Sequence, residues 1–512
     1  MSRSKCVTIE IICILFALVF SARAGRTDSK GPARKTTGFQ TARLENPRIN
    51  MRSIRLNDAM DLQTTYPAAN ELGRRLERGA ARPVALASGD FDEDGVPDLL
   101  SGYAGPGGGI LALHRGNADS IYPNSPEAQQ RKARGTFTGA PFLPPEQVFE
   151  LPEAAELLGT GDFNNDGHLD VVAAAHGSAA LQLLSGDGRG KLGGAQRVEL
   201  PGRVTALVTG EINRPDGLID VIVGITGPAG PKVLVFESPE GILRGRPEAI
   251  TLPAEATALA LGELDEDFAD LAVAAGRDLL IVHGHDHKPG FEEGSPFEVP
   301  HAAQSVAGET DPRGMSVSAM TQPRSSLPTG GTPVPRVSQM SFPFTLTSLA
   351  IGNFAGERSP GLAVLSEDGT VRLLTRGQGP EAVSQSGSFS GVSTAGQKQS
   401  KIEDWQPREL FRLSQSDRTR PPSLARAWVS GRPADDLILV DRIHRQLLIP
   451  AGETVARLQD EATIFAAPAP SSVPVSLNLD NEPVAVLPMR LNADALTDLV
   501  ILESGTGGRR SP

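Results

Sequence analysis

The sequence lacks features on which several common protein classes depend. Only two of its 512 residues are cysteines, Cys6 and Cys13, and aromatic residues make up 4% of the chain. Its conspicuous apolar run, from Ile11 to Phe20, has ten residues, too few to span a bilayer core about 30 Å thick. We therefore expect neither a disulfide framework nor a membrane-spanning anchor.

The first 24 residues have the organisation of a secretory signal peptide. MSRSK is basic, the apolar run follows, and Ala22 and Ala24 place small residues at the spacing that signal peptidase requires. Both cysteines lie in this segment, and neither follows the small-residue box of a lipoprotein. The sequence predicts a cysteine-free protein that is secreted, extracellular or at the cell surface, with the periplasm as the alternative compartment.

The balance of charge excludes two kinds of partner. The formal net charge is −12, and it becomes −14 without the first 24 residues, because these contain three basic residues and only one acid. An acidic surface repels phosphate backbones and anionic headgroups. We expect no nucleic-acid partner and no membrane insertion after cleavage.

Familiar catalytic motifs are missing. There is no G-x-S-x-G elbow, and the glycine run at 102–109 lacks the Lys-Ser/Thr pair of a phosphate-binding loop. HGHDH (283–287) follows the apolar stretch LLIV, where earlier parts of the chain have plain polar turns. We interpret it as a turn, with a transition-metal site as the alternative.

What the sequence does contain is a repeated acidic loop, first seen in GDFDEDGVPDLL (89–100). Its acids occupy positions one, three, five and nine, with Gly95 at position six: Asp90, Asp92, Asp94 and Asp98. Alternate carboxylates around a tight turn can converge on a hard cation such as Ca²⁺. An EF-hand would carry Glu at position twelve, where this chain has Ser101. The motif predicts a calcium loop between two short strands.

Three further copies keep all or part of this ligand set. GDFNNDGHLDVVA (161–173) is complete, whereas the copies at 210–224 and 262–276 have one residue too many or too few. The predicted ligands are Asp162, Asn164, Asp166 and Asp170 in the second copy, Glu211, Asn213, Asp216 and Asp220 in the third, and Glu263, Asp265 and Asp267, followed by Asp270, in the fourth. Within a complete set, metal binding is favoured over acid-base catalysis, because metal-held carboxylates are poor proton donors.

Three later copies keep the strand-loop-strand outline without a full ligand set, at 352–365, 423–440 and 484–502. In the last of them Asn492, Asp494 and Asp498 remain, but position one is Arg490. We predict that the guanidinium of Arg490 replaces the metal there.

The spacing of the seven copies predicts the fold. The shortest interval, 50 residues between 171 and 221 or between 221 and 271, accommodates a four-stranded antiparallel unit. Such units bury both faces when they are arranged radially. We predict an all-β, seven-bladed β-propeller. The motifs resemble the FG-GAP or VCBS repeat of the integrin α-subunit propeller superfamily and of bacterial secreted proteins, and this resemblance covers roughly residues 84 to 502.

The rest of the chain divides around this unit. We expect a partly flexible N-terminal segment at 25–83, the propeller at 84–502 with disordered insertions near 300–340 and 376–401, and a tail at 503–512. Asn70 can cap a short helix at 70–78. Because the last copy is followed by too little chain for four strands, RINMRSIRL (48–56) is a candidate closing strand. The alternative is that the chain is the front of a longer protein whose remaining part completes the blade.

Two functions fit this reading. The first is a secreted, calcium-binding interaction or scaffold module, monomeric, with an extracellular protein or glycan as ligand. The alternative is an enzyme on the same fold that acts on extracellular polysaccharide, as some calcium-dependent propeller lyases do. Sugar sites usually need aromatic platforms, and this chain has only two Trp and three Tyr. The first function is favoured, with Ca²⁺ as the cofactor and no catalytic residue assigned.

Overall fold

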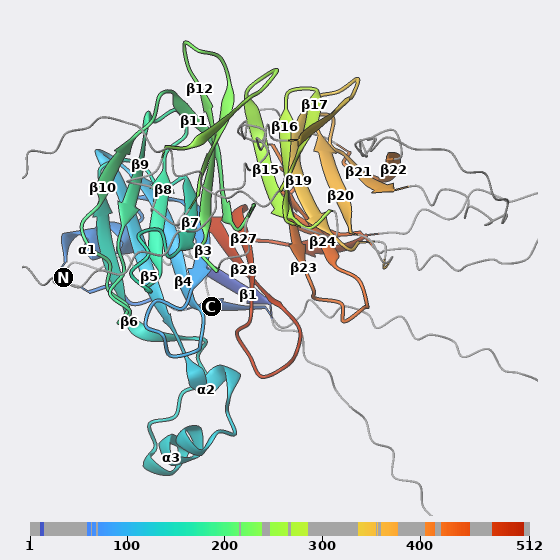
Figure 1. The fold of residues 1–512 in the computed structure, drawn as a ribbon. Helices are drawn as coiled ribbons and strands as arrows, with labels where there is room; N and C mark the ends of the chain where they lie inside the picture. The colour runs from blue at the N-terminus through green and yellow to red at the C-terminus, as the bar shows by residue number, and fades with distance from the viewer. Residues whose placement is uncertain are drawn as a thin grey trace, which may run out of the picture.

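The protein is an all-β β-propeller, seen in a computed structural model (Figure 1). The structure describes residues 11–14, 59–62, 64–67, 70–213, 217–237, 246–264, 268–284, 336–354, 356, 360–376, 405–414, 421–450 and 474–505. The predicted disordered insertion at 376–401 lies outside these residues apart from Arg376, and so does the candidate closing strand at 48–56.

Six four-stranded antiparallel sheets are each built from strands consecutive in sequence. The first contains β3 (Arg82–Gly89), β4 (Asp98–Gly105), β5 (Gly108–Gly116) and β6 (Phe142–Leu151). The second contains β7 (Leu157–Gly161), β8 (Asp170–Ala174), β9 (Ala180–Leu184) and β10 (Gln196–Glu199). The third contains β11 (Arg203–Gly210), β12 (Asp220–Thr226), β13 (Lys232–Phe236) and β14 (Glu248–Thr251).

The remaining three sheets follow the same order. They are β15 (Ala256–Gly262), β16 (Asp270–Ala275), β17 (Asp278–His283) and β18 (Arg336–Ser341); β19 (Leu346–Gly352), β20 (Gly361–Ser366), β21 (Thr370–Arg376) and β22 (Trp405–Arg412); and β23 (Ser423–Ala427), β24 (Asp436–Asp441), β25 (Gln446–Ile449) and β26 (Val475–Asn478). Strand β18 corrects one prediction: residues 336–340 belong to a sheet, not to a disordered insertion, because they pair with β17.

Among the described residues the last repeat supplies two strands, β27 (Glu482–Met489) and β28 (Asp498–Ser504). Two N-terminal strands, β1 (Ile11–Ile14) and β2 (Ala59–Leu62), extend this sheet in the order β2-β1-β28-β27. The prediction of seven like blades is thus confirmed only for the propeller fold and for six blades complete in themselves. The N-terminal residues that extend this sheet are 11–14 and 59–62, whereas the candidate strand at 48–56 lies outside the described residues.

Strand sequences explain why the sheets pack face to face. The second strand of each complete blade is buried along most of its length, and most of these strands are rich in apolar residues, as in DVIVGIT of β12. Such continuous apolar strands need cover on both faces, which neighbouring blades provide. Between the second and third blades, for example, Val172, Leu181, Val223 and Leu234 form one cluster. The composite sheet packs on both sides as well, through Ile501 against the sixth blade and Val500 against the first.

The described residues also include three helices that lie outside the sheets. Helix α1 (Glu71–Glu77) begins at Asn70, whose side chain accepts the amide of Leu72 at 2.9 Å, so the predicted capped helix is confirmed. Helices α2 (Ala118–Ile121) and α3 (Pro126–Arg134) form an insertion between β5 and β6 that projects from the first blade (Figure 1). No helix in the described part of the chain is long and apolar enough to cross a membrane.

Candidate metal centre

The first acidic loop joins β3 to β4 in a tight turn that is held by hydrogen bonds from backbone amides to the side chain of Asp90. The carboxylate of Asp90 accepts the amides of Asp94 (3.1 Å) and Gly95 (2.9 Å), one with each oxygen. Glu93 (φ 58°) and Gly95 (φ 82°) both have left-handed backbones, and glycine adopts this conformation without steric cost. The glycine at position six is therefore a requirement of the turn.

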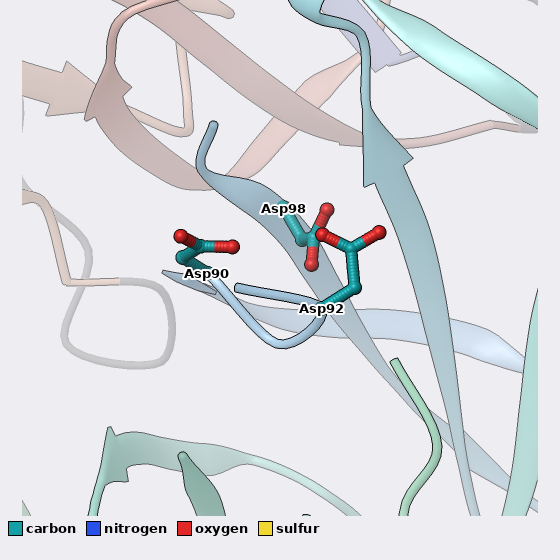
Figure 2. Close-up of side chains that lie close together, drawn as sticks. All are labelled: Asp90, Asp92 and Asp98. Atoms are coloured by element: carbon teal, nitrogen blue, oxygen red, sulfur yellow. The ribbon is translucent and has the colours of Figure 1, made fainter. Parts of the chain in front are cut away.

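Three carboxylates converge in this loop (Figure 2). One oxygen from each of Asp90, Asp92 and Asp98 lies within 4.8 Å of the other two. Oδ1 of Asp92 is buried and has no hydrogen-bond partner among the described residues. A buried, unsatisfied carboxylate oxygen is costly, and a hard cation at the centre of the three groups would satisfy it. These residues therefore fit Ca²⁺.

Asp98 also has a structural role that the sequence pattern did not reveal. Its two oxygens accept the amides of Phe91 (3.0 Å) and Gly116 (2.7 Å), tying the loop to the end of β5. The pKa of Asp98 is raised to about 7, mainly because the carboxyl is buried, and the negative charge of Asp92 raises it further. The two hydrogen bonds from backbone amides act in the opposite direction and lower the pKa. The position-nine aspartate is thus a latch between strands as well as a candidate ligand.

The same latch recurs in five further loops. In each, a buried aspartate accepts the amide of the loop's second residue at 2.8–3.2 Å: Asp170, Asp220, Asp270, Asp436 and Asp498. The fifth blade has Gly361 at the matching position, and there Asp435 of the next blade accepts the amide of Asn353 at 2.7 Å. This aspartate is kept in loops that lost the other acids, so its recurrence in the sequence reflects loop architecture as well as metal binding.

The second loop repeats the backbone of the first. Asp162 accepts the amides of Asp166 (3.2 Å) and Gly167 (2.9 Å), and Asn165 (φ 61°) stands where Glu93 does. At position three, however, the side-chain nitrogen Nδ2 of Asn164 donates to Oδ2 of Asp166 at 2.9 Å and lies 3.4 Å from Oδ1 of Asp170. The pKa of Asp170 is raised to about 6, mainly by burial. Among the described residues the carboxylates of Asp162, Asp166 and Asp170 do not converge within 4.8 Å as those of the first loop do, so calcium binding by Asp162, Asn164, Asp166 and Asp170 stays a prediction.

The two complete loops touch each other. Nδ1 of His168, in the second loop, lies 2.6 Å from Oε1 of Glu93 in the first. The hydrogen bond to Glu93 is the main cause that raises the pKa of His168. The turn that follows β9 also reaches across, because the amide of Gly190 donates to the carbonyl of Phe91 at 2.8 Å. A change in the conformation of one loop can therefore alter the other loop through these contacts.

The third and fourth loops are described only in part. Asp216, Asp265 and Asp267 lie outside the described residues. Asn213 is buried and donates to Glu237, and Asp220 and Asp270 form the latches already described. Glu211 and Glu263 stand at the ends of β11 and β15. Metal binding by these two loops stays a prediction.

The prediction for Arg490 is wrong in its geometry. Its Nε donates to the carbonyl oxygen of Asn492 at 3.3 Å, and its guanidinium stands over the ring of Tyr122, 5.6 Å from the centroid. The side-chain amide Nδ2 of Asn492 donates to Oδ1 of Asp498 at 2.9 Å instead. An arginine does reach the carboxylates of an acidic loop, but it is Arg115, whose guanidinium contacts Asp92 and Asp94 of the first loop. Nothing in the local motif pointed to it, because Arg115 comes from the end of β5.

A second polar cluster has the elements of a nucleophile-base pair. Oγ of Ser101 lies 2.8 Å from Nε2 of His114, whose Nδ1 is 3.7 Å from Oε1 of Glu146. All three side chains are buried beneath the N-terminal segment, where Glu146 accepts the amide of Thr65 and Tyr66 packs edge-on against His114. Catalysis requires a substrate within hydrogen-bond reach, and burial prevents this. The cluster holds the segment to the first blade.

The histidine-rich stretch begins in a strand. His283 ends β17, is buried, and lies 3.0 Å from Asp270 and 3.1 Å from Ser338. The prediction of a turn is therefore wrong for His283, which completes a latch. His285 and His287 lie outside the described residues.

The acidic repeat is similar to that of a known protein family. The family model described as an FG-GAP-like repeat matches residues 162–223. No curated protein matches the chain. Among solved structures, BBS1N in complex with ARL6DN, soaked with lead, aligns with a TM-score of 0.44 and 11% identity over 82% of this chain and 93% of that one.

Two structures of polycomb repressive complex 2 align less well. An active complex in the basal state gives a TM-score of 0.39 and 10% identity, over 72% of this chain and 66% of that chain. The Chaetomium thermophilum complex gives 0.37 and 11%, over 73% and 66%.

Proposed function

Taking the chain as an FG-GAP repeat β-propeller, we propose that it is a calcium-binding interaction module. The observation that carries calcium binding is the convergence of Asp90, Asp92 and Asp98 around a buried carboxylate oxygen without a hydrogen-bond partner. The second loop has the same turn and the same latch. Bound Ca²⁺ would satisfy these oxygens and tie strand ends together in a protein that we expect to lack disulfides.

The proposal includes a ring of seven blades. The sheet of β27, β28, β1 and β2 packs against both the sixth and the first blade, which is what a closing blade requires. It also includes export. Residues 11–14 would serve either as strand β1 or as part of a cleaved signal peptide. Cleavage after Ala24 would remove β1, which lies between β2 and β28, so β2 would then have to pair with β28 directly.

The N-terminal sequence of protein purified from a secreting host tests export. A terminus at Gly25 supports it, whereas an intact terminus assigns 11–14 to the propeller. If the terminus is at Gly25, deleting residues 2–62 should lower the melting temperature much more than deleting 2–24, because only the longer deletion removes β2. Equal melting temperatures for the two deletions would contradict closure by β2.

The proposed partner surface surrounds the loop of the last repeat. Tyr122 (48% exposed) and Trp428 (38% exposed) are the large aromatic side chains that the described residues leave exposed. Tyr122 lies under Arg490, and the carbonyl of Trp428 accepts the amide of Thr497, so they stand on either side of the loop at 490–498. Exposed Trp, Tyr and Arg are the residues that dominate protein interfaces. We therefore infer a protein ligand.

Binding of the purified protein to arrays of extracellular proteins and of glycans, with calcium and with chelator, tests this function. The proposal expects a protein ligand whose binding falls in Tyr122→Ala and Trp428→Ala but not in Glu127→Ala, on the exposed face of α3. Binding to glycans alone would contradict the protein ligand, and glycan cleavage would favour the enzyme. Calcium measured by calorimetry and elemental analysis tests the cofactor separately.

A further inference from the structure

The strand-end residue Arg115 brings a positive charge into the first acidic loop. It precedes Gly116, whose amide donates to Asp98 at 2.7 Å, so the end of β5 is fixed against the loop. The guanidinium forms an ion pair with Asp92 through Nε and lies 3.4 Å from Oδ2 of Asp94 through Nη2. Two of the four predicted calcium ligands therefore already have a cationic partner.

Burial makes this pairing strong. The side chain of Asp92 is only 8% exposed, although that of Arg115 is 54% exposed. A buried carboxylate is costly unless a cation or hydrogen bonds compensate it, and a guanidinium offers several donors in a plane. Oδ2 of Asp92 has this compensation, whereas Oδ1 has none. A calcium ion entering the loop must displace Arg115 or accept its positive charge nearby.

The matching position differs in every loop that can be compared. His114 pairs with Leu99 in the first blade, and Leu184 pairs with Val171 in the second, so Ser185 corresponds to Arg115. By the same register Glu237 follows the strand in the third blade and His283 ends it in the fourth. Each contacts its own loop: Ser185 lies 3.2 Å from Asn164, Glu237 accepts from Asn213, and His283 lies 3.0 Å from Asp270.

We propose that Arg115 is a built-in cation of the first loop, and that the residue at this strand-end position sets how strongly each loop binds calcium. The proposal deepens the calcium-binding function and rests on it. The second loop has Asn164 where the first has Asp92, but calcium entering it displaces no cation because Ser185 is neutral, and for this reason the second loop binds calcium more tightly than the first. The first loop keeps its turn in the absence of calcium, since Arg115 neutralises part of its charge.

Exchanging the two residues tests the proposal. Calcium binding is measured by calorimetry in Arg115→Ser and Ser185→Arg, and Arg115→Ser is also compared with wild-type Arg115 in an Asp166→Ala background, so that the second loop does not contribute to the difference. We expect Arg115→Ser to strengthen calcium binding at the first loop at least tenfold, which corresponds to about 1.4 kcal/mol. Ser185→Arg should weaken the second loop by a similar factor. Arg134→Ser, which removes an exposed charge from α3, is the control.

A melting experiment in chelator separates this proposal from calcium binding itself. Arg115→Ser should then lower the melting temperature, because Asp92 and Asp94 lose their cation, while Arg134→Ser should not. If the wild type and both exchange variants bind no calcium, the proposed function fails, yet the melting result still tests the built-in cation. Unchanged affinity in Arg115→Ser, or equal melting of Arg115→Ser and Arg134→Ser, would overturn it.

Discussion

The first and second acidic loops share a backbone but differ in how their charge is balanced. Both fold over a position-one aspartate and a left-handed glycine, and both are latched by a buried aspartate. In the first loop an arginine from outside the motif pairs with Asp92, whereas in the second Asn164 and Ser185 bring no charge. The same turn is therefore stabilised in two ways.

The latch is where we expect the largest effects, and they should be alike in the two loops. Asp98→Ala and Asp170→Ala each leave two backbone amides without their acceptor. Each lost partner of a buried group costs about 1–3 kcal/mol, so the free energy of unfolding should fall by about 2–6 kcal/mol. Urea unfolding in chelator measures this, with the exposed Asp187→Ala as the control. A mild effect in one loop alone would break the equivalence of the latches.

Removing calcium should have the next largest effect, and mainly through the second loop. An ion that binds only the folded state adds about 2.7 kcal/mol at a hundredfold excess over its Kd. We expect chelator to lower the melting temperature of the wild type. Asp162→Ala should remove most of this response, because it deletes the position-one ligand of the loop without a built-in cation. A response that survives in Asp162→Ala but disappears in Asp90→Ala would reverse the ranking of the loops.

Single central ligands should separate the loops further. Asp92→Ala and Asp166→Ala should each weaken calcium binding, since each removes a carboxylate from a predicted set. Asp494→Ala should leave calcium binding unchanged, because the last repeat has Arg490 at position one. Calorimetry with the three variants measures this. Equal losses in all three would show that the last loop also binds an ion.

The smallest expected effect concerns the contact between the loops. His168 forms a hydrogen bond with Glu93, and this bond is the main reason why the pKa of His168 is raised. A raised pKa in the folded state means that the contact stabilises fully below the ordinary pKa of histidine and that this contribution is lost as pH rises through the raised value. Because both groups are exposed, the gain is small. Histidine titration by NMR in the wild type and in Glu93→Gln measures it, and an unchanged His168 titration would exclude the contact.

The repeat motif predicted the local structure well, because its elements depend on neighbouring residues. The loop at 90–98 needs Gly95, and the apolar stretch that follows it becomes β4. The cap of α1 by Asn70 is equally local. Partners distant in sequence were predicted poorly. Arg490 was expected to replace a metal but lies over Tyr122, and the strand at 336–341 depends on pairing with β17.

The repeat, the all-β propeller, the turns of the two complete acidic loops and the set of candidate ligands could be predicted from the sequence. They follow from spacing, glycine and apolar alternation within single stretches of chain. The addition of β1 and β2 to the last sheet, and the contact of Arg115 at the end of β5 with the carboxylates of the first loop, could be found only from the folded chain. The physical reason is that charge balance and strand pairing depend on distance in space, and a propeller brings strand ends from different parts of the chain to the same loop.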